Sequence, residues 1–394
     1  MRRSICLCIS QFYPVFSGAE RQAFLQGAEL VRRGHRVHVI TTAVPGEPTH
    51  ADLEGIEVHR VARFIRLGPL FGLTLLRSLS AALVRRRQEF DLVHTHQAMW
   101  EACATGLVRK RLGRPVLVQP AASGYYGEQQ ALDRTRGRRL LRRLVRRNTH
   151  FAAISDEITE ELTARGVEPA RITRMDSGVD VNEFRPATPD DDRKAPLRNL
   201  DPGGPDWSHQ PIVVFAGRLH PQKNLRGLLD AWARVAREET AHLLLLGDGP
   251  DRHELQQQVE RLGCTSSVRF AGRIHDVALW LRAADAFVLP SLSEGSSNSL
   301  LEGMATGLPC LVSRIGGNVD MVRHDETGLV IDPHDTEGWH RALLAVVRDR
   351  PLANRLGAAA RRWVTAHRSI PAVVTRYEEL YDRLLSEGQP VRNR

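Results

Sequence analysis

The sequence predicts an α/β protein built from two Rossmann-like, doubly wound domains. In both halves of the chain, short apolar runs that suit buried parallel strands alternate with segments of helical periodicity. A stretch without periodicity separates the halves, and 394 residues are too many for one ordinary hydrophobic core. Hydrophobic residues at 42% and charged residues at 26% are typical of a folded domain, which argues against a disordered chain.

We expect the first domain over residues 1–185. Its predicted strands are "SICLCIS", "HRVHVITT", "DLVHTH", "PVLVQP" and "THFAAIS". The segment "AERQAFLQGAELVRRG" follows the first strand with helical periodicity and ends at a glycine, a common stop signal for a helix. This alternation indicates a parallel sheet with helices on both faces.

The second domain is expected over residues 211–365. Residues 186–210 are rich in proline, aspartate and glycine, which predicts a linker or a surface loop. The strands predicted beyond it are "PIVVFAG", "HLLLLGDG", "VRFAG", "AFVLP" and "PCLVS". Residues 366–394 predict an amphipathic helix that can cross back to the first domain. We expect the carboxyl edges of the two sheets to face each other across a central cleft that encloses the substrate.

The net charge of +9 is concentrated in one segment. Residues 134–148 carry eight arginines, and Leu140, Leu141, Leu144 and Val145 form an apolar stripe at helical spacing. The segment Arg134 to Arg147 suits an anionic membrane surface. The alternative is an exposed helix whose leucine stripe packs on its own domain. We expect no nucleic-acid partner, because no recognition motif for nucleic acid is present.

Cysteine usage and hydropathy indicate a cytoplasmic protein. The five cysteines are odd in number and include no Cys-x-x-Cys pair, which argues against a disulfide framework or a zinc ribbon. No stretch approaches the roughly 20 apolar residues that a transmembrane helix needs. The expected localisation is the cytoplasm, with peripheral attachment to the inner face of the plasma membrane as an option.

The segment Pro290 to Ser313, "PSLSEGSSNSLLEGMATGLPCLVS", predicts a strand end, a loop, a helix and a second strand. The first amides of such a helix have no internal partner, so residues 295–299 can bind an anion such as phosphate. Carboxylates accept hydrogen bonds from hydroxyls, so Glu294 and Glu302 suit a sugar or a ribose, and together these features favour a nucleotide sugar. As alternatives, Ser299 and Glu302 fit a capping box, and Glu294 fits an ordinary surface acid.

Several separated motifs resemble one enzyme family. They are "FAGRLHPQKNLRGLLDAW", "LLLLGDGP", "RFAGRIHDV", "ADAFVLPSLSEGSSNSLLEGMATGLPCLVSRIGGNVDMV" and "ETGLVIDPHD". Together they resemble the donor domain of the retaining glycosyltransferases of family 4, the group 1 enzymes, which have the GT-B fold. The first half agrees in order through "SGAERQ", "HTHQ", "ISDEITEEL" and "MDSGVDVNEFRP". The resemblance covers nearly the whole chain, with departures at Ser177, Asn224 and Asp320.

The resemblance implies a role for each matched residue. Arg218 and Lys223 hold the donor's diphosphate, Glu294 contacts the transferred sugar, and Glu302 binds the ribose hydroxyls. The strand-end residue His96 positions the substrate or polarises a backbone carbonyl, and it does not act as a general base. Other donor-binding positions that the match implies are Gly18, Gly272, Ile274, Gly295, Ser296, Ser297, Asn298 and Ser299. A zinc pair at His94 and His96 is also conceivable, although the sequence offers no evident third ligand.

The implied reaction moves a hexosyl group from a UDP- or GDP-sugar to an acceptor hydroxyl with retention, in bacterial polysaccharide or glycolipid assembly. The departing diphosphate accepts the acceptor's proton, so we expect neither a cofactor nor a metal. The acceptor is expected to be a carbohydrate or a lipid-linked sugar. One alternative is a GT-B nucleotide-sugar epimerase or hydrolase, for which His96 is the candidate base. Another is a non-catalytic basic scaffold that binds membrane or RNA.

Overall fold

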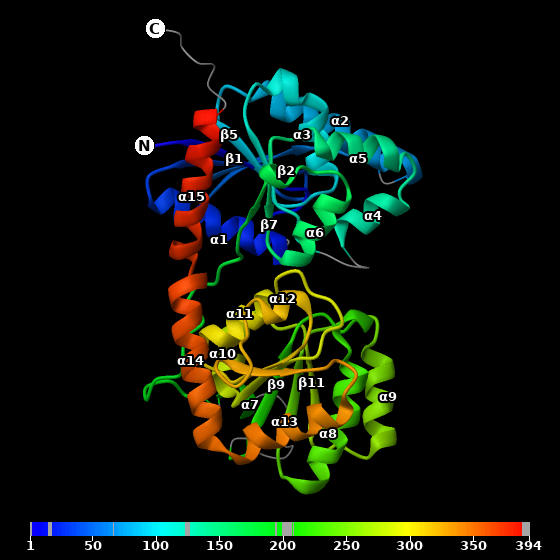
Figure 1. The fold of residues 1–394 in the computed structure, drawn as a ribbon, viewed down its shortest axis with the longest axis vertical. Coiled ribbons are helices and arrows are strands. Elements are labelled where there is room, and N and C mark those ends of the chain that lie inside the picture. The colour runs from blue at the N-terminus through cyan, green and yellow to red at the C-terminus, as the bar shows by residue number, and fades with distance from the viewer. Residues whose placement is uncertain are drawn as a thin grey trace. The chain divides into compact units, whose positions relative to one another are not determined.

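The computed structural model describes residues 2–14, 18–65, 67–122, 127–193, 195–198, 207 and 209–387. The chain divides into two compact units, which Figure 1 shows as ribbons. Unit 1 comprises Met1–Gly178 together with Ile370–Arg394, and unit 2 comprises Val179–Ser369. Each unit has its own sheet covered by helices, so the predicted α/β class with two doubly wound sheets is confirmed.

The sheet of unit 1 has the strand order β3-β4-β2-β1-β5-β6-β7-β8. All neighbours pair in parallel except β3 and β4 at the edge. The strands are β1 (Ser4–Cys8), β2 (Arg36–Thr42), β3 (His50–Leu53), β4 (Ile56–Ala62), β5 (Leu92–Thr95), β6 (Val116–Val118), β7 (His150–Ala153) and β8 (Ile172–Arg174). Because β1 is central and the chain moves outward from it in both directions, the order reverses between β1 and β5.

The helices of unit 1 cover both faces of this sheet (Figure 1). They are α1 (Gly18–Arg32), α2 (Gly68–Arg85), α3 (Trp100–Leu112), α4 (Glu128–Arg134), α5 (Arg138–Arg146), α6 (Asp156–Ala164) and α15 (Ile370–Glu387). One core cluster unites residues of α2, α3, α5 and α6 with the sheet, and another unites residues of α1 and α15. In the second cluster Tyr377 and Tyr381 are each 1% exposed, which fixes α15 on the α1 face.

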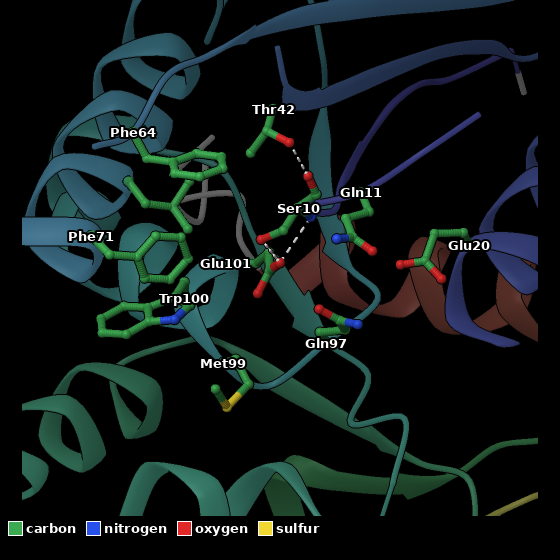
Figure 2. A pocket seen from close by; sticks show the side chains of 11 residues that line it. Ser10, Gln11, Glu20, Thr42, Phe64, Phe71, Gln97, Met99, Trp100 and Glu101 are labelled. Atoms are coloured by element: carbon green, nitrogen blue, oxygen red, sulfur yellow. Dashed lines mark hydrogen bonds between the residues drawn. The ribbon is translucent and has the colours of Figure 1, made fainter. Parts of the chain in front are cut away.

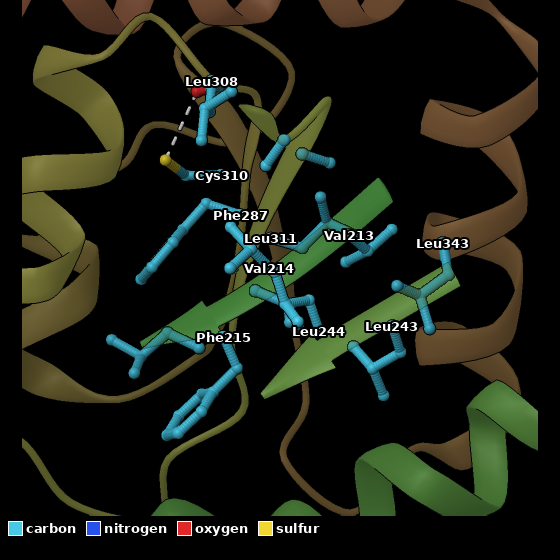
Figure 3. Packing of buried hydrophobic residues seen from close by; sticks show 14 of the residues in the cluster. Val213, Val214, Phe215, Leu243, Leu244, Phe287, Leu308, Cys310, Leu311 and Leu343 are labelled. Atoms are coloured by element: carbon cyan, nitrogen blue, oxygen red, sulfur yellow. Dashed lines mark hydrogen bonds between the residues drawn. The ribbon is translucent and has the colours of Figure 1, made fainter. Parts of the chain in front are cut away.

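The sheet of unit 2 is entirely parallel, with the order β11-β10-β9-β12-β13-β14. Its strands are β9 (Ile212–Ala216), β10 (His242–Leu246), β11 (Val268–Gly272), β12 (Ala286–Leu289), β13 (Cys310–Ser313) and β14 (Gly328–Ile331). Figure 3 shows Val214, Leu244, Phe287 and Leu343 in the core around these strands. This is the Rossmann order, with its reversal between β9 and β12.

The helices of unit 2 are α7 (Ala195–Arg198), α8 (Leu225–Glu238), α9 (Arg252–Leu262), α10 (Val277–Ala283), α11 (Asn298–Ala305), α12 (Gly316–Val319), α13 (Thr336–Arg348) and α14 (Arg350–Arg368). Five of them, α8 to α12, lie in the connections between its strands, whereas α7 precedes the sheet in the sequence and α13 and α14 follow it. Two 3₁₀ turns complete the described elements, one in each unit: η2 (Pro169–Arg171) and η3 (Pro221–Lys223). No helix of the described residues combines the length and apolar character needed to cross a bilayer.

The unit boundaries differ from those expected. Unit 2 comprises Val179–Ser369, whereas the second domain was expected over residues 211–365 after a linker at 186–210. The return to unit 1 comes at Ile370 rather than 366. Within the stretch expected to be a linker, Leu197 and Trp207 are buried in the core of unit 2. Arg193 also forms an ion pair with Asp285 at 2.7 Å. The described part of this stretch therefore packs as a piece of unit 2.

Candidate functional site

The strand order of the unit 2 sheet reverses between β9 and β12, and this reversal marks one point at the carboxyl edge of the sheet. The two strands are neighbours, with Ala286 opposite Val213, although β10 and β11 separate them in the sequence. The loops that follow them leave toward opposite sides of the sheet, which opens a crevice where ligands bind in folds of this type. The sequence-predicted residues Arg218, Lys223 and Glu294 all lie in these two loops.

The loop after β9 is held by its neighbour after β10. A Cβ atom at position 247 would lie 1.9 Å from the carbonyl oxygen of Gly217, and one at position 249 would lie 2.1 Å from that of Leu219. Only glycine allows this approach. The Leu219 amide then donates to the Asp248 carbonyl at 3.0 Å. The side chain between these anchors, Arg218, is exposed.

Lys223 and Glu294 meet directly. The Lys223 Nζ atom lies 2.5 Å from Glu294 Oε1, and the Ser291 hydroxyl donates to the same oxygen at 2.6 Å. Glu294 is 7% exposed, so it is not the solvated surface acid of the alternative interpretation. Its partners stabilise a buried carboxylate that would otherwise be costly.

Gln222 joins the two loops, which the sequence analysis did not anticipate. Its side-chain amide donates to the Ser293 carbonyl at 2.8 Å, and its own carbonyl accepts from the Leu292 amide at 2.8 Å. These bonds hold the turn with Lys223 against the loop with Glu294. In the sequence, the one indication of a role for Gln222 was its position next to Lys223 in "HPQKN". Its partner Ser293 is 71 residues away, so the sequence did not indicate the contact.

The beginning of α11 excludes the capping-box alternative. Ser297 is the N-cap, and its hydroxyl accepts from the Leu300 amide at 3.4 Å. Glu302 stands two positions beyond that amide and is 8% exposed, so it is not the third residue of a box. The Leu300 amide is therefore capped by Ser297, and Glu302 does not take part in a capping box.

The other predicted donor positions lie along the same edge. Gly272 ends β11 with φ of 72°, a conformation that favours glycine, and its carbonyl accepts from the Gly247 amide at 2.8 Å. Ile274, two residues further, is half-buried. A Cβ atom at Gly317 would lie 2.3 Å from the Gly295 carbonyl oxygen, so the "GG" of α12 supports the loop of Glu294.

His96 and Gly18 belong to unit 1. His96 follows β5 and is 1% exposed, and its ring centroid lies 4.2 Å from that of His94. Burial lowers the pKa of His96 to about 3, so the imidazole is neutral. His94 Nδ1 bonds the Tyr381 hydroxyl at 2.8 Å, and the described residues supply no third ligand for a zinc pair here. Gly18 is the exposed first residue of α1.

Unit 1 has a cavity of about 720 Å³ at its own reversal point, between β1 and β5 (Figure 2). One side is polar and the other is apolar, with aromatic rings. The polar side chains are Ser10, Gln11, Glu20, Thr42, Gln97 and Glu101, and the apolar ones are Phe64, Phe71, Leu75, Met99 and Trp100. The sequence analysis proposed none of these residues, because they come from six separate segments.

Glu101 is one of two buried acids of this cavity, beside Glu20. Its Oε1 accepts from the Ser10 amide at 2.8 Å and from the Ser10 hydroxyl. Its Oε2 is buried and has no hydrogen-bond partner among the described residues. Burial raises the pKa of the Glu101 carboxyl, although the bonds from Ser10 oppose this change. A carboxyl in this setting can donate or accept a hydrogen bond from a ligand hydroxyl.

Comparison with known proteins identifies the family of the chain. The family described as "Glycosyl transferase 4-like domain" matches residues 17–178, and the one described as "Glycosyl transferases group 1" matches residues 210–349. A D-inositol 3-phosphate glycosyltransferase of Rhodococcus opacus is 30% identical over 383 residues, covering 86% of this chain and 80% of that protein. An N-acetyl-alpha-D-glucosaminyl L-malate synthase of Bacillus anthracis is 25% identical, covering 96% of this chain and 97% of that protein.

Solved structures give the same fold. The sucrose-phosphate synthase of Thermosynechococcus elongatus superposes with a TM-score of 0.82 at 23% identity, covering 98% of this chain and 100% of that chain. The fold and the sequence matches together define a glycosyltransferase with the GT-B fold. The chain belongs to the group 1 glycosyltransferases of family 4 type.

Proposed function

We propose that this glycosyltransferase moves a hexosyl group from a nucleoside diphosphate sugar to an acceptor hydroxyl with retention at the anomeric carbon. The observation that carries the proposal is the Lys223–Glu294 pair at the β9/β12 reversal, beside the exposed Arg218. Cations for a diphosphate and a carboxylate for sugar hydroxyls lie within one crevice edge. A nucleotide sugar contains both of these groups, a diphosphate and sugar hydroxyls.

In the proposed donor complex, Arg218 and Lys223 bind the diphosphate. Lys223 then shares its charge between Glu294 and the phosphate oxygens, which leaves Glu294 able to accept a sugar hydroxyl. As the glycosidic bond breaks, negative charge grows on the departing diphosphate, and fixed cations stabilise that charge in the transition state. The amides from Gly295 to Ser299 add donors to the phosphate, and Glu302 binds the ribose.

The environment of Glu294 supports the proposal of retention without a covalent intermediate. A carboxylate that is held by Lys223 and Ser291 is a weak nucleophile, because its charge is already engaged. The departing diphosphate oxygen can instead take the acceptor proton on the same face of the sugar. His96 is buried and neutral, which favours a positioning role over the general base that an epimerase or hydrolase needs.

The transfer step needs no divalent metal in this proposal, because Arg218 and Lys223 supply the positive charge. We expect chelation with EDTA to leave initial rates unchanged. A loss of activity that manganese restores would contradict this part of the proposal.

We place the acceptor in the cavity of unit 1. Sugars have a hydroxyl edge and an apolar C–H face, which match the polar and aromatic sides of the cavity. A relative from Escherichia coli, 26% identical over 75% of this chain and 76% of its own length, is named "UDP-Gal:alpha-D-GlcNAc-diphosphoundecaprenol alpha-1,3-galactosyltransferase". By analogy we propose a UDP-sugar as the first donor to test, ahead of GDP-sugars, and a glycosyl acceptor of polysaccharide or glycolipid assembly, including lipid-linked ones.

The basic helix α5 supports a second proposal, attachment to anionic membranes at the cytoplasmic face. Leu141, Leu144 and Val145 are buried in unit 1, so most of the apolar stripe packs on its own domain. Leu140 remains 61% exposed, next to the exposed Arg139 and several other exposed arginines of the segment. The lipid contact is therefore expected to be mainly electrostatic.

Vesicle flotation tests this attachment. The double variant Arg139→Glu/Arg143→Glu should lose binding to vesicles of phosphatidylglycerol at low salt, whereas Arg237→Glu on α8 should not. Wild-type protein that stays at the bottom of the gradient would exclude the membrane proposal. That result would leave the transferase proposal untouched.

A thermal-shift screen tests the donor class. UDP, GDP, ADP and their sugar conjugates are added to the wild type, to Arg218→Ala and to a matched control, Arg237→Ala, which removes an exposed arginine of α8. A ligand at one hundred times its dissociation constant stabilises by about 2.7 kcal/mol, which is readily measured. We expect one nucleotide class to shift the wild type and the control but not Arg218→Ala. No shift with any nucleotide would contradict the proposed donor site.

Product stereochemistry tests retention separately. The anomeric configuration of the new glycosidic bond, read by NMR, should equal that of the donor. An inverted product would exclude the same-face mechanism while leaving the transferase activity intact.

A further inference from the structure

Two histidines and a glutamate meet on the sheet of unit 1, outside both sites described above. His38 lies on β2, and Glu57 and His59 lie on the neighbouring β4. The strands pair in parallel with His38 opposite Glu57 and Ile40 opposite His59. Side chains alternate along a strand, so Glu57 and His59 point to the same face as His38. Each residue offers one ligand atom, and these atoms lie within 4.8 Å of one another.

The cluster is compact and largely closed to water. His38 is 2% exposed and His59 is 7% exposed, whereas the side chain of Glu57 is 43% exposed. The two imidazole rings are nearly parallel, with centroids 5.9 Å apart. His38 Nδ1 lies 3.3 Å from Glu57 Oε2. The half-open glutamate provides a path by which an ion can reach two buried nitrogens.

Three of the four ring nitrogens of this cluster lack hydrogen bonds within the described part of the chain. Both ring nitrogens of His59 and Nδ1 of His38 have no such partner among the described residues. Burying polar atoms without a partner is costly, so proteins rarely do it without a reason. A metal ion would supply the missing partner for His38 Nδ1 and for one nitrogen of His59.

The other ring nitrogen of His38, Nε2, has a hydrogen-bond partner, as the second nitrogen of a histidine has in many metal sites. The Nε2 atom of His38 lies 3.1 Å from the Ser4 hydroxyl, which leaves Nδ1 facing Glu57 and His59. Metal-binding histidines usually use their second nitrogen for such a bond, which fixes the orientation of the ring.

The surrounding charges do not exclude a cation. Arg36 donates to Glu57 Oε1 at 3.1 Å, which leaves Oε2 facing the cluster. Arg86, at the end of α2, is paired with Glu89 at 2.8 Å. The two arginines are thus balanced by two carboxylates, and a divalent ion meets no net positive charge from these groups.

We infer that His38, Glu57 and His59 form a binding site for Zn²⁺ or a similar borderline transition-metal ion. Two imidazole nitrogens with one carboxylate suit zinc and disfavour magnesium and calcium, which prefer all-oxygen ligands. Zinc–ligand bonds of about 2.0–2.2 Å require the three side chains to close in slightly by rotation. A fourth position stays open to water or to a further ligand.

This ion has a structural role, separate from glycosyl transfer. His38 is near the start of β2, whereas Thr42 at the end of β2 lines the cavity. Four residues of strand span about 13 Å, so the ion does not reach the cavity. It links β2 to β4, next to the edge strand β3. The inference does not depend on the proposed function.

Zinc titration with a competing chromogenic chelator tests the site. The chain has 16 histidines, so adventitious binding must be separated from the site. The wild type should bind one equivalent tightly, and cobalt in its place should give the visible bands of a low-coordinate site. Glu57→Gln, His38→Ala and His59→Ala should each weaken binding by about 100-fold or more, since changes outside the ligand shell already cost 10–100-fold. The control His253→Ala removes an exposed histidine of α9 and should bind as the wild type does.

Folding and specificity are checked in the same series. Glu57→Gln keeps the size of a half-exposed side chain, so it stays informative if the buried histidine variants fail to fold. Zinc should raise the melting temperature of the wild type but not of Glu57→Gln, and magnesium should raise neither. Equal zinc affinity in Glu57→Gln and the wild type would overturn the inference, as would the absence of a tight equivalent. Donor binding should be the same in both proteins, so either result leaves the proposed function unaffected.

Discussion

The two units have their candidate sites at the same topological point, where the strand order of the sheet reverses, but different side chains line the two sites. In unit 2 the β9/β12 reversal carries charged groups, Lys223 paired with Glu294 and Arg218 exposed beside them. In unit 1 the β1/β5 reversal carries a cavity with an aromatic side and two buried acids, Glu20 and Glu101. The doubly wound strand order, which both sheets share, determines where a ligand binds, and the loops determine which kind of ligand the site suits. A diphosphate suits the first site and an uncharged sugar suits the second.

The largest expected effect comes from removing the cations of unit 2. Loss of one group that stabilises developing charge typically lowers kcat by about 10²–10³-fold, so Arg218→Ala and Lys223→Ala should each show a loss of this order. Lys223→Arg keeps the charge and should recover part of the rate. Initial rates with the donor from the screen measure this, with Arg237→Ala as the control. Near-wild-type kcat in both alanine variants would contradict the charged role of this site.

A smaller change is expected from crowding the apolar side of the unit 1 cavity. A Cβ atom at Gly72 would lie 2.2 Å from the Trp100 ring, so Gly72→Ala must displace that ring. Overpacking of this kind costs about 1–3 kcal/mol of stability. The KM for the acceptor should rise and the Kd for the nucleotide should stay constant. An unchanged acceptor KM would show that Trp100 takes no part in acceptor binding.

Glu101→Ala probes the polar side of the same cavity. Loss of one hydrogen bond from a buried carboxyl to a ligand hydroxyl is worth roughly 1.5 kcal/mol, so the acceptor KM should rise about tenfold. Donor affinity, read by thermal shift, should not change. Weakened donor binding in this variant would break the division of tasks between the two units.

The smallest effect is expected in the pH dependence of stability. Burial raises the pKa of Glu101 above its ordinary value of 4.5, so folding favours the protonated form. The stability that this proton contributes is complete below 4.5 and is lost as the pH rises through the pKa of the folded state. Glu101→Gln mimics the protonated group, so its unfolding free energy should decline less with rising pH than that of the wild type. Urea unfolding at several pH values measures this, and parallel pH profiles would contradict the raised pKa.

The sequence was most informative where residues act through local motifs. The strand–loop–helix pattern around Glu294 and the motif around Arg218 and Lys223 placed these residues at strand ends, and the structure brings Lys223 and Glu294 into contact. The N-cap of α11 is Ser297, and the capping box at Ser299 and Glu302 was a competing interpretation that the structure excludes.

Other features depend on strand register and tertiary packing, which a single sequence does not reveal. The unit 1 cavity combines side chains from six segments, and no local pattern links Glu101 to Ser10. The cluster of His38, Glu57 and His59 exists because β2 pairs with β4 in one particular register. A shift of one residue would send these side chains to opposite faces of the sheet.

The helix α15 has a consequence for how the chain is made. Unit 1 includes Ile370–Arg394, which follow the whole of unit 2 in the sequence. The Tyr377 hydroxyl donates to Gln119 at 2.6 Å, and the Tyr381 hydroxyl bonds His94 at 2.8 Å, so α15 fills a buried face of the amino-terminal sheet. During translation this face must wait for residues that leave the ribosome after unit 2. The carboxyl-terminal sheet can therefore complete its fold first, while the amino-terminal one, although synthesised earlier, remains unfinished until α15 emerges.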